Sequence, residues 1–272
     1  MKTYHTPKVL TLLFAVAASA FAQAKEVQIN AKVISVPLDA AALRDAGLAL
    51  ESTAAMSNLG IIPADKAAAM LAKLEKISGH ALMYSPSFVT RSGVRSTSES
   101  IREFIYPTEF VPAKISSEAG SKPVQIAPGQ VIAATPSTPR SFEMRHTGFR
   151  LEVEPVINSD GTLIEMNLAP ELVAFEGFIN YSSPVKAVAA DKEGKLSEVV
   201  LTENHVLQPV FCVVKSTIGV SMPSGHVLVL GGASGGSLPS AATKPDLTRQ
   251  AKLDGKPTQA VFFFIQVKAF TP

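Results

Sequence analysis

Apolar and polar residues alternate along much of this chain, with the period of two that is typical of β-strands with one apolar face. The clearest case is residues 149–168, where the turn signal Asn158-Ser159-Asp160-Gly161 separates two alternating runs. The apolar positions of these runs are Phe149, Leu151, Val153, Ile164, Met166 and Leu168. We therefore predict an antiparallel hairpin over residues 149–168.

Other segments carry the same strand pattern. Residues 27–36 are rich in β-branched side chains and predict a first strand. A long run over residues 206–222 alternates, and the turn signal at 223–225 leads into a strand at 226–232. Residues 260–270 predict the last strand. The apolar positions of the long run are Val210, Cys212, Val214, Ile218 and Val220.

Within residues 79–148, the turn residues predict where strands and loops lie. Arg91-Ser92-Gly93 indicates a hairpin between strands at 81–90 and 94–104. Residues 107–139 are rich in Pro, Ser, Gly and Lys, which predicts a long loop or a mobile hairpin. Loops of this length are uncommon in compact domains unless they serve a function.

Helical periodicity is confined to the N-terminal quarter. Residues 63–78 predict a helix with Pro63 in its first turn and Gly79 after its end, and residues 38–50 predict a short helix. The apolar face of the longer helix consists of Ala67, Met70, Leu71, Leu74 and Ile77. The chain is thus predicted to have an α+β fold, mostly antiparallel β, with an α/β lead-in at 23–78 and a β domain at 79–272.

The one long hydrophobic run lies at the N-terminus, within residues 1–22. Lys2 and Lys8 precede about ten apolar residues, and small residues follow, which is the pattern of a secretory signal peptide. Cleavage is predicted after Ala22 or Ala24, so the mature chain is expected to be exported. No later run reaches about 18 apolar residues, the length that a transmembrane helix needs, whereas hydropathy leaves a β-barrel open.

Composition excludes several classes of protein. The 272 residues are 46% hydrophobic and 18% charged, with one Cys and a net charge of +2, so the chain is not collagen-like, disordered or rich in disulfides. A charge this close to zero gives no reason to expect nucleic acid as a partner. Cys212, as the single cysteine, cannot form an internal disulfide.

Candidate chemistry in the chain is weak. Residues 232–236 fit G-x-S-x-G around Ser234, but no His follows this serine, as the hydrolase order requires. Glu152, Glu154 and Glu165 could pair as glycosidase carboxylates, although a solvated or lumen-facing sheet surface is the favoured interpretation. The scattered His residues lack metal-ligand spacing. We predict no catalytic residue, no metal and no cofactor, and keep a hydrolase at Ser234 only as a third hypothesis.

Six segments, taken in order, resemble the secretin domain of type II and type III secretion systems and type IV pilus systems. They are residues 85–93 (SPSFVTRSG), 102–110 (REFIYPTEF), 148–155 (GFRLEVEP), 175–181 (FEGFINY), 208–211 (QPVF) and 227–232 (VLVLGG). Each motif alone is weak, but their order and spacing are specific. The likeness spans most of the mature chain and is strongest over residues 79–232.

The resemblance implies a ring of identical subunits, each contributing strands to one gated β-barrel in the outer membrane. The gate would include Tyr106, Pro107, Thr108 and Glu109 within a region extending from 106 to 140. The barrel wall would contain Phe149, Leu151, Val153, Ile164, Met166, Leu168, Val210, Val214, Ile218 and Val220. Phe175, Phe178, Ile179 and Tyr181 would lie near the membrane-facing rim. Closing such a ring removes the free strand edges.

The chain also departs from the family pattern. Only residues 23–78 precede the family-like region, whereas full-length secretins carry several periplasmic ring-building domains there. The gate segment lacks the Gly of the family's V-P-x-x-T-G pattern, and residues 237–257 lack the family's usual run. Two hypotheses follow: a short secretin that forms a pore by itself or with secretion or pilus components, or a soluble periplasmic module that assists a full-length secretin.

Overall fold

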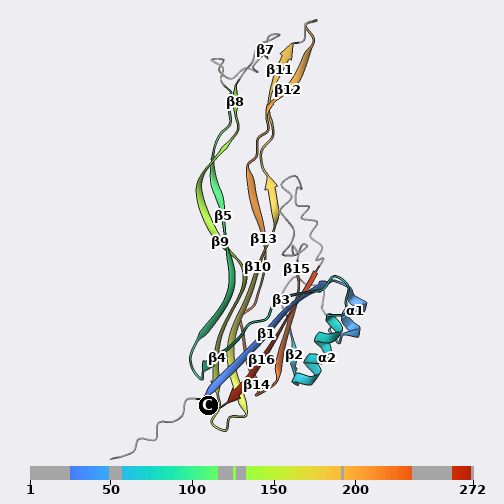
Figure 1. Ribbon diagram of the computed structural model, residues 1–272, viewed down its shortest axis with the longest axis vertical. Helices are drawn as coiled ribbons and strands as arrows, with labels where there is room; N and C mark the ends of the chain where they lie inside the picture. Colours follow the sequence, from blue (N-terminus) through green and yellow to red (C-terminus); the bar gives the residue numbers. More distant parts are fainter. Residues whose placement is uncertain are drawn as a thin grey trace, which may run out of the picture.

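The computed structural model of the protein describes residues 25–48, 57–115, 125–126, 133–190, 193–234 and 259–270. The predicted signal peptide lies outside these residues, as do residues 237–257. The described part has a base of two packed sheets with a helical layer, and two long hairpins rise from it (Figure 1). None of the helices in these ranges is long and apolar enough to cross a membrane.

The first of the two sheets, sheet A, joins the two ends of the described chain. Its strand order is β2-β15-β16-β1-β3, and β4 also pairs with β1. Its strands are β1 (Glu26–Pro37), β2 (Ser57–Ile62), β3 (Ala81–Tyr84), β4 (Ser87–Arg91), β15 (Val227–Ser234) and β16 (Gln259–Phe270). β1 pairs with β16 along its whole length, from Glu26 opposite Phe270 to Pro37 opposite Gln259. The predicted first and last strands are confirmed and lie side by side.

Two helices cover one face of sheet A. They are α1 (Ala40–Asp45) and α2 (Ala64–Leu74), as the periodicity predicts. Asp39 caps α1, because its Oδ1 accepts hydrogen bonds from the amides of Ala41 (2.9 Å) and Ala42 (3.3 Å). Ala67, Leu71 and Leu74 of α2 are buried against the sheet, and Met70 and Ile77 pack beside them. The predicted apolar face of the helix is therefore its packed face.

The second sheet, sheet B, is an antiparallel meander of order β13-β10-β9-β5. Its strands are β5 (Ser96–Val111), β9 (Thr138–Ile157), β10 (Leu163–Asn180), β13 (Leu207–Lys215) and β14 (Ile218–Pro223). β14 pairs with the first part of β10 and β13 with the rest, so the long run predicted at 206–222 forms one edge broken at Ser216-Thr217. The predicted hairpin at 149–168 is confirmed as the β9–β10 pair.

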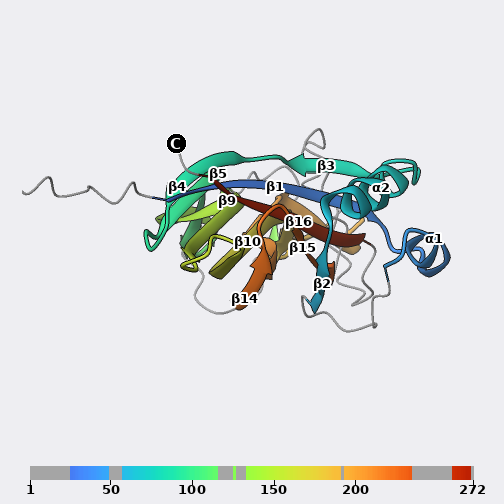
Figure 2. The same cartoon turned by 90° about the horizontal axis from the view of Figure 1, so that it is seen from below.

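The two sheets pack face to face, with the helices on the far side of sheet A (Figure 2). Phe149 of sheet B lies 5.9 Å from Phe263 and 5.5 Å from Tyr84, measured between ring centroids. The other buried residues that sheet B contributes are Leu151, Val153, Ile157, Ile164, Met166, Leu168, Leu172, Val214 and Met222. The period-two pattern thus buries one face of sheet B against sheet A.

Two hairpins continue beyond sheet A, toward the top of Figure 1. One is β5–β9, whose upper part leads to β6 (Lys114–Ile115) and β8 (Ala134–Thr135). The other is β10–β13, which leads to β11 (Val185–Ala190) and β12 (Leu196–Thr202), with β7 (Gln125–Ile126) beside β11. The ends of the segment predicted as a long loop or mobile hairpin are therefore paired strands.

The hairpin predicted around Arg91-Ser92-Gly93 is wrong. β4 pairs with β1 in sheet A, whereas β5 pairs with β9 in sheet B, so the chain changes sheets at this turn. The turn's amides bond elsewhere: Ser92 N donates to Lys25 O (2.9 Å) and Gly93 N to Pro155 O (2.7 Å). The turn residues specify a chain reversal but not the partner strands.

Candidate functional site

The face of sheet B that points away from sheet A, called here the outward face, is polar in its lower part. Arg150 lies there between the buried Phe149 and Leu151, with its Nε 3.1 Å from Glu99 and its Nη2 3.6 Å from Glu152. Arg95 pairs with Glu152 (3.1 Å) and with Glu154. Glu152 and Glu154 thus both form ion pairs with arginines on a solvated surface.

A shallow cavity of about 310 Å³ lies on the same face. Its lining includes Glu154 and Glu165 together with Asn167 and Ser221. Two of the three glutamates predicted as a carboxylate group therefore share this cavity, while Glu152 is held by arginines at its side. Among the described residues, no group of three His, Cys, Asp or Glu side chains could hold a metal ion.

Two residues higher along the strands, the side chains on the outward face change from charged to apolar. Ile101, Gly148, Val173 and Val213 form a row in register across all four strands. Above them, Ile105 (65% exposed) is opposite Met144 (52%), and Pro107 is opposite Phe142 (59%). The upper outward face thus exposes large apolar side chains, interrupted by Glu103 opposite His146.

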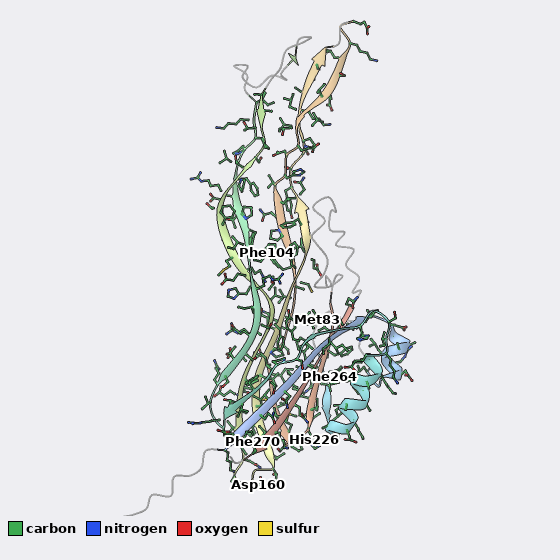
Figure 3. The ribbon with its side chains drawn as sticks, viewed as in Figure 1. Met83, Phe104, Asp160, His226, Phe264 and Phe270 are labelled. Atoms are coloured by element: carbon green, nitrogen blue, oxygen red, sulfur yellow. The ribbon has the colours of Figure 1, made fainter. Side chains whose placement is uncertain are left out.

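An aromatic cluster joins the two rising hairpins. It consists of Phe104, Tyr106, Phe175, Phe178 and Phe211, and Figure 3 labels Phe104 between the hairpins. Phe104 stacks on Phe175 at 4.6 Å and meets the edge of Phe211 at 5.4 Å. The guanidinium of Arg145 lies 5.0 Å from the Phe211 ring centre, and Gln208 Nε2 donates to Pro107 O (3.1 Å). These contacts hold β5 and β13 together.

A bulge in β10 places two of these rings on one face. The register with β13 shifts between Phe175 and Gly177, so Glu176 is an extra residue and Phe175 and Phe178 share a face. The Cys212 thiol hydrogen bonds to Glu176, whose Oε1 is buried without another partner among the described residues. Cys212 is thus engaged within the strand pair.

The predicted rim residues do not share one environment. Phe175 and Phe178 belong to the aromatic cluster, Ile179 is half-buried and Tyr181 is 69% exposed. The structure therefore brings two of the four together. Phe104, Phe211 and Arg145 were not identified as partners from the sequence, because the rings lie on three different strands and Arg145 on a fourth, so that they share no local signal.

The predicted gate residues lie in the upper part of β5. Tyr106 belongs to the aromatic cluster, and its hydroxyl donates to Glu143 Oε2 at 3.4 Å. Ser141 donates its hydroxyl to Glu109 (2.9 Å), and its carbonyl accepts the hydroxyl of Thr108 at 3.5 Å. All four gate candidates therefore lie in a strand that is tied to β9.

The predicted wall residues lie in sheet B, and all of them except Val210 pack in the core between sheet B and sheet A. Seven of them are buried between the sheets, namely Phe149, Leu151, Val153, Ile164, Met166, Leu168 and Val214. Val210, Ile218 and Val220 are half-buried. The apolar side chains on the outward face are other residues, which the sequence pattern did not single out.

The lower turn between β9 and β10 is fixed by polar contacts. The amide and hydroxyl of Thr162 donate to Asp160 Oδ1 at 2.9 and 2.7 Å, and these bonds lower the pKa of Asp160. Lys25 Nζ donates to the carbonyls of Asn158 and Ser159, both at 2.9 Å. Asp160 is labelled at the bottom of Figure 3.

The serine motif lies at the end of β15. Ser234 is opposite Gln259 of β16, and Gly235 and Gly236 lie outside the described residues. His226, the last histidine, lies at the start of the same strand, and its Nδ1 is buried without a partner in the described part of the chain. Serine and histidine thus lie at opposite ends of one strand.

No family model matches the chain, and no curated protein matches it. Among solved structures it is similar to InvG, the secretin of the Salmonella SPI-1 type III secretion injectisome, with 12% identity over 92% of this chain and a TM-score of 0.32. It is also similar to a chain of the pilotin–secretin AspS–GspD complex of ETEC, with 14% identity over 92% of this chain and a TM-score of 0.33. The chain spans 66% and 50% of the lengths of those two chains.

Proposed function

We propose that the protein is a secretin-like component of an outer-membrane protein secretion or type IV pilus pore. Copies associate side by side, and each contributes sheet B to one gated β-barrel. The barrel transports substrates, catalyses no reaction and uses no cofactor. The observation that carries this proposal is the outward face of sheet B, which changes from ion-paired to apolar at one level across four strands. A boundary between water and lipid accounts for such a change.

The size of the apolar zone supports this assignment. Residues 101–107 of β5 cover about 20 Å at the rise of a β-strand, close to the apolar band of about 25 Å on outer-membrane barrels. Ile105, Phe142 and Met144 expose more than half of their surface there. In water, a patch of this kind costs free energy, whereas lipid contact removes the cost.

The two edges of sheet B support association between copies. β5 pairs only with β9, and β13 and β14 pair only with β10, within the described ranges. Unpaired strand edges invite further pairing, and a closed ring of copies satisfies them. By the resemblance, the region from 106 to 140 forms the gate, which β5 and β9 carry at their upper ends.

Membrane fractionation tests this function. We expect the native protein to remain in outer membranes after a carbonate wash and to yield an SDS-resistant multimer with ring-shaped particles. Replacing Ile105 and Phe142 with Glu should release it from the membrane fraction, whereas Thr97→Glu, on the polar part of the same face, should not. Monomers only, found in the soluble fraction, would overturn the proposal.

One observation favours a second candidate, a soluble periplasmic module that assists a full-length secretin. The aromatic cluster holds β5 and β13 together within a single chain, which partly closes sheet B on itself. A chain that stays in this form has the upper parts of β5 and β13 in contact with each other and not with a neighbouring copy. Recovery of the native protein in the periplasmic fraction, bound to a secretin, would support this candidate.

A further inference from the structure

A row of alternating charge crosses the outward face of sheet B just below the apolar zone. Glu99, Arg150, Glu171 and Lys215 are opposite one another on β5, β9, β10 and β13. Opposite charges at facing positions stabilise neighbouring strands. The row ends in Lys215, which is exposed at the free edge and forms no ion pair with any residue that the structure describes.

β5, at the other edge, carries two carboxylates near the charged row: Glu99 in the row itself and Glu103 four residues above it. Glu99 is already paired with Arg150 at 3.1 Å. Glu103 is exposed, and within the described part of the chain no ion pair engages it. A single copy therefore leaves Lys215 on β13 and Glu103 on β5 outside any ion pair among the described residues, although Lys215 faces Glu171 on β10.

The geometry of a barrel decides which carboxylate a neighbour brings to Lys215. Strands in a closed barrel tilt by 35–45° from its axis. With four strands per copy, a displacement of four residues at each junction shifts the pairing by about 13.6 Å over a width of about 19 Å, which gives a tilt of about 35°. No displacement would give upright strands.

The charges decide the direction of this displacement. From the position opposite Glu99, four residues one way bring Lys215 to Glu103, and four residues the other way bring it to Arg95, a like charge. The first direction also places Val213 opposite Ile105, so that two exposed apolar side chains meet. An odd displacement would place each side chain on the wrong face.

We infer that β13 of one copy pairs antiparallel with β5 of the next, in the register that brings Lys215 to Glu103 of the neighbour. This inference rests on the proposed function and specifies its subunit interface. The ion pair sets the register within the lower part of the neighbour's apolar zone, where the low dielectric of nearby lipid strengthens it.

Cross-linking between two differently tagged chains tests the register. Both chains carry Cys212→Ser, one carries Val213→Cys, and the other carries Ile105→Cys, Ile101→Cys or Thr97→Cys, so that Lys215 and Glu103 stay in place. The three positions on β5 are spaced four residues apart, about 13 Å, whereas a disulfide requires Cα atoms within about 7 Å. After mild oxidation we expect at least tenfold more cross-linked dimer with Cys at 105 than at 101 or 97.

The results of this experiment distinguish an error in the subunit register from an error in the proposed function. Multimers that cross-link through position 101 or 97 would overturn the register and leave the pore intact. Absence of multimers from the unmodified chain would overturn the proposed function itself.

Charge reversal gives a second, independent test. Lys215→Glu should reduce the multimer yield at least fivefold, and Glu103→Lys in the same chain should restore it. Lys268→Glu is the matched control, because Lys268 is exposed on β16, away from both edges of sheet B. Far-UV circular dichroism of each variant shows that the chain is folded. Full assembly of Lys215→Glu, or no rescue by the second change, would contradict the ion pair.

Discussion

Gly148 should be the least replaceable residue of sheet B. It lies in β9 where that strand leaves β10, opposite Ile101 on one side and Val173 on the other. Its φ of +117° is in a region that side chains rarely adopt. A Cβ added there would approach the carbonyl oxygen of Ser100 and would lie 3.1 Å from Ile101 Cα. These are backbone atoms of β5, so only a movement of the whole strand relieves the clash.

The expected cost of Gly148→Ala has two parts. The unfavourable backbone conformation contributes about 1–3 kcal/mol. Separating β5 from β9 at this point breaks one or two ladder hydrogen bonds, worth about 1 kcal/mol each. The total is about 2–5 kcal/mol, with a midpoint near 3.5 kcal/mol. Gly161→Ala is the matched control, because Gly161 has a φ of +79° but no atom within 4 Å of its added Cβ. Its cost is about 1–2 kcal/mol, from conformation alone.

Urea unfolding of the dispersed chain, followed by far-UV circular dichroism, measures both variants. We expect Gly148→Ala to lose about 2 kcal/mol more than Gly161→Ala, which is roughly a 30-fold difference in the unfolding equilibrium constant. Hydrogen exchange at the Ile101 amide should accelerate only in Gly148→Ala. If both variants lose the same free energy, the close approach of β5 and β9 at Gly148 is wrong.

Three further predictions concern the core, the lower turn and the aromatic cluster. Phe263→Ala, fully buried between the sheets, should cost about 3–5 kcal/mol in urea unfolding, whereas Phe142→Ala, 59% exposed, should change the unfolding free energy by less than about 0.5 kcal/mol. Because hydrogen bonds from Thr162 lower the pKa of Asp160, its carboxylate stabilises the fold above the ordinary Asp pKa of about 3.9. That contribution is lost as the pH falls through the lowered pKa. Wild type and Asp160→Ala should therefore differ in melting temperature at pH 7 and converge as the pH falls well below the ordinary Asp pKa; a constant difference would contradict this. Phe211→Ala should speed proteolysis in the upper hairpins while Val213→Ala does not, since only Phe211 contacts rings on β5.

Local signals explain what the sequence predicted correctly. The β9–β10 hairpin has its turn residues directly between two alternating runs, and Asp160 and Asn158 hydrogen bond within that turn. The helix α2 follows Pro63 directly and has its predicted apolar face within one short segment, although it ends at Leu74, before the predicted Gly79. Each of these elements is specified by residues that lie close together in the chain.

Pairing between distant segments could not be predicted in the same way. β1 and β16 are hydrogen bonded along their length although most of the chain separates them. The turn at Arg91-Ser92-Gly93 has the composition of a hairpin, yet its amides bond to Lys25 and Pro155 and the flanking strands enter different sheets. Turn composition gives a reversal of direction, and only packing selects the partner strand.

The alternation of apolar and polar residues also does not predict which environment each face of sheet B contacts. Leu151 and Ile164 are fully buried against sheet A, so their substitution tests whether the chain folds. Ile105 and Met144 lie in segments with weaker alternation, yet they expose more than half of their surface above the charged row. In the proposed pore, membrane contact depends on the second pair, whereas folding depends on the first. Loss of folded protein in a Leu151 variant says nothing about a pore, whereas loss of membrane retention in a folded Ile105 variant tests the pore directly.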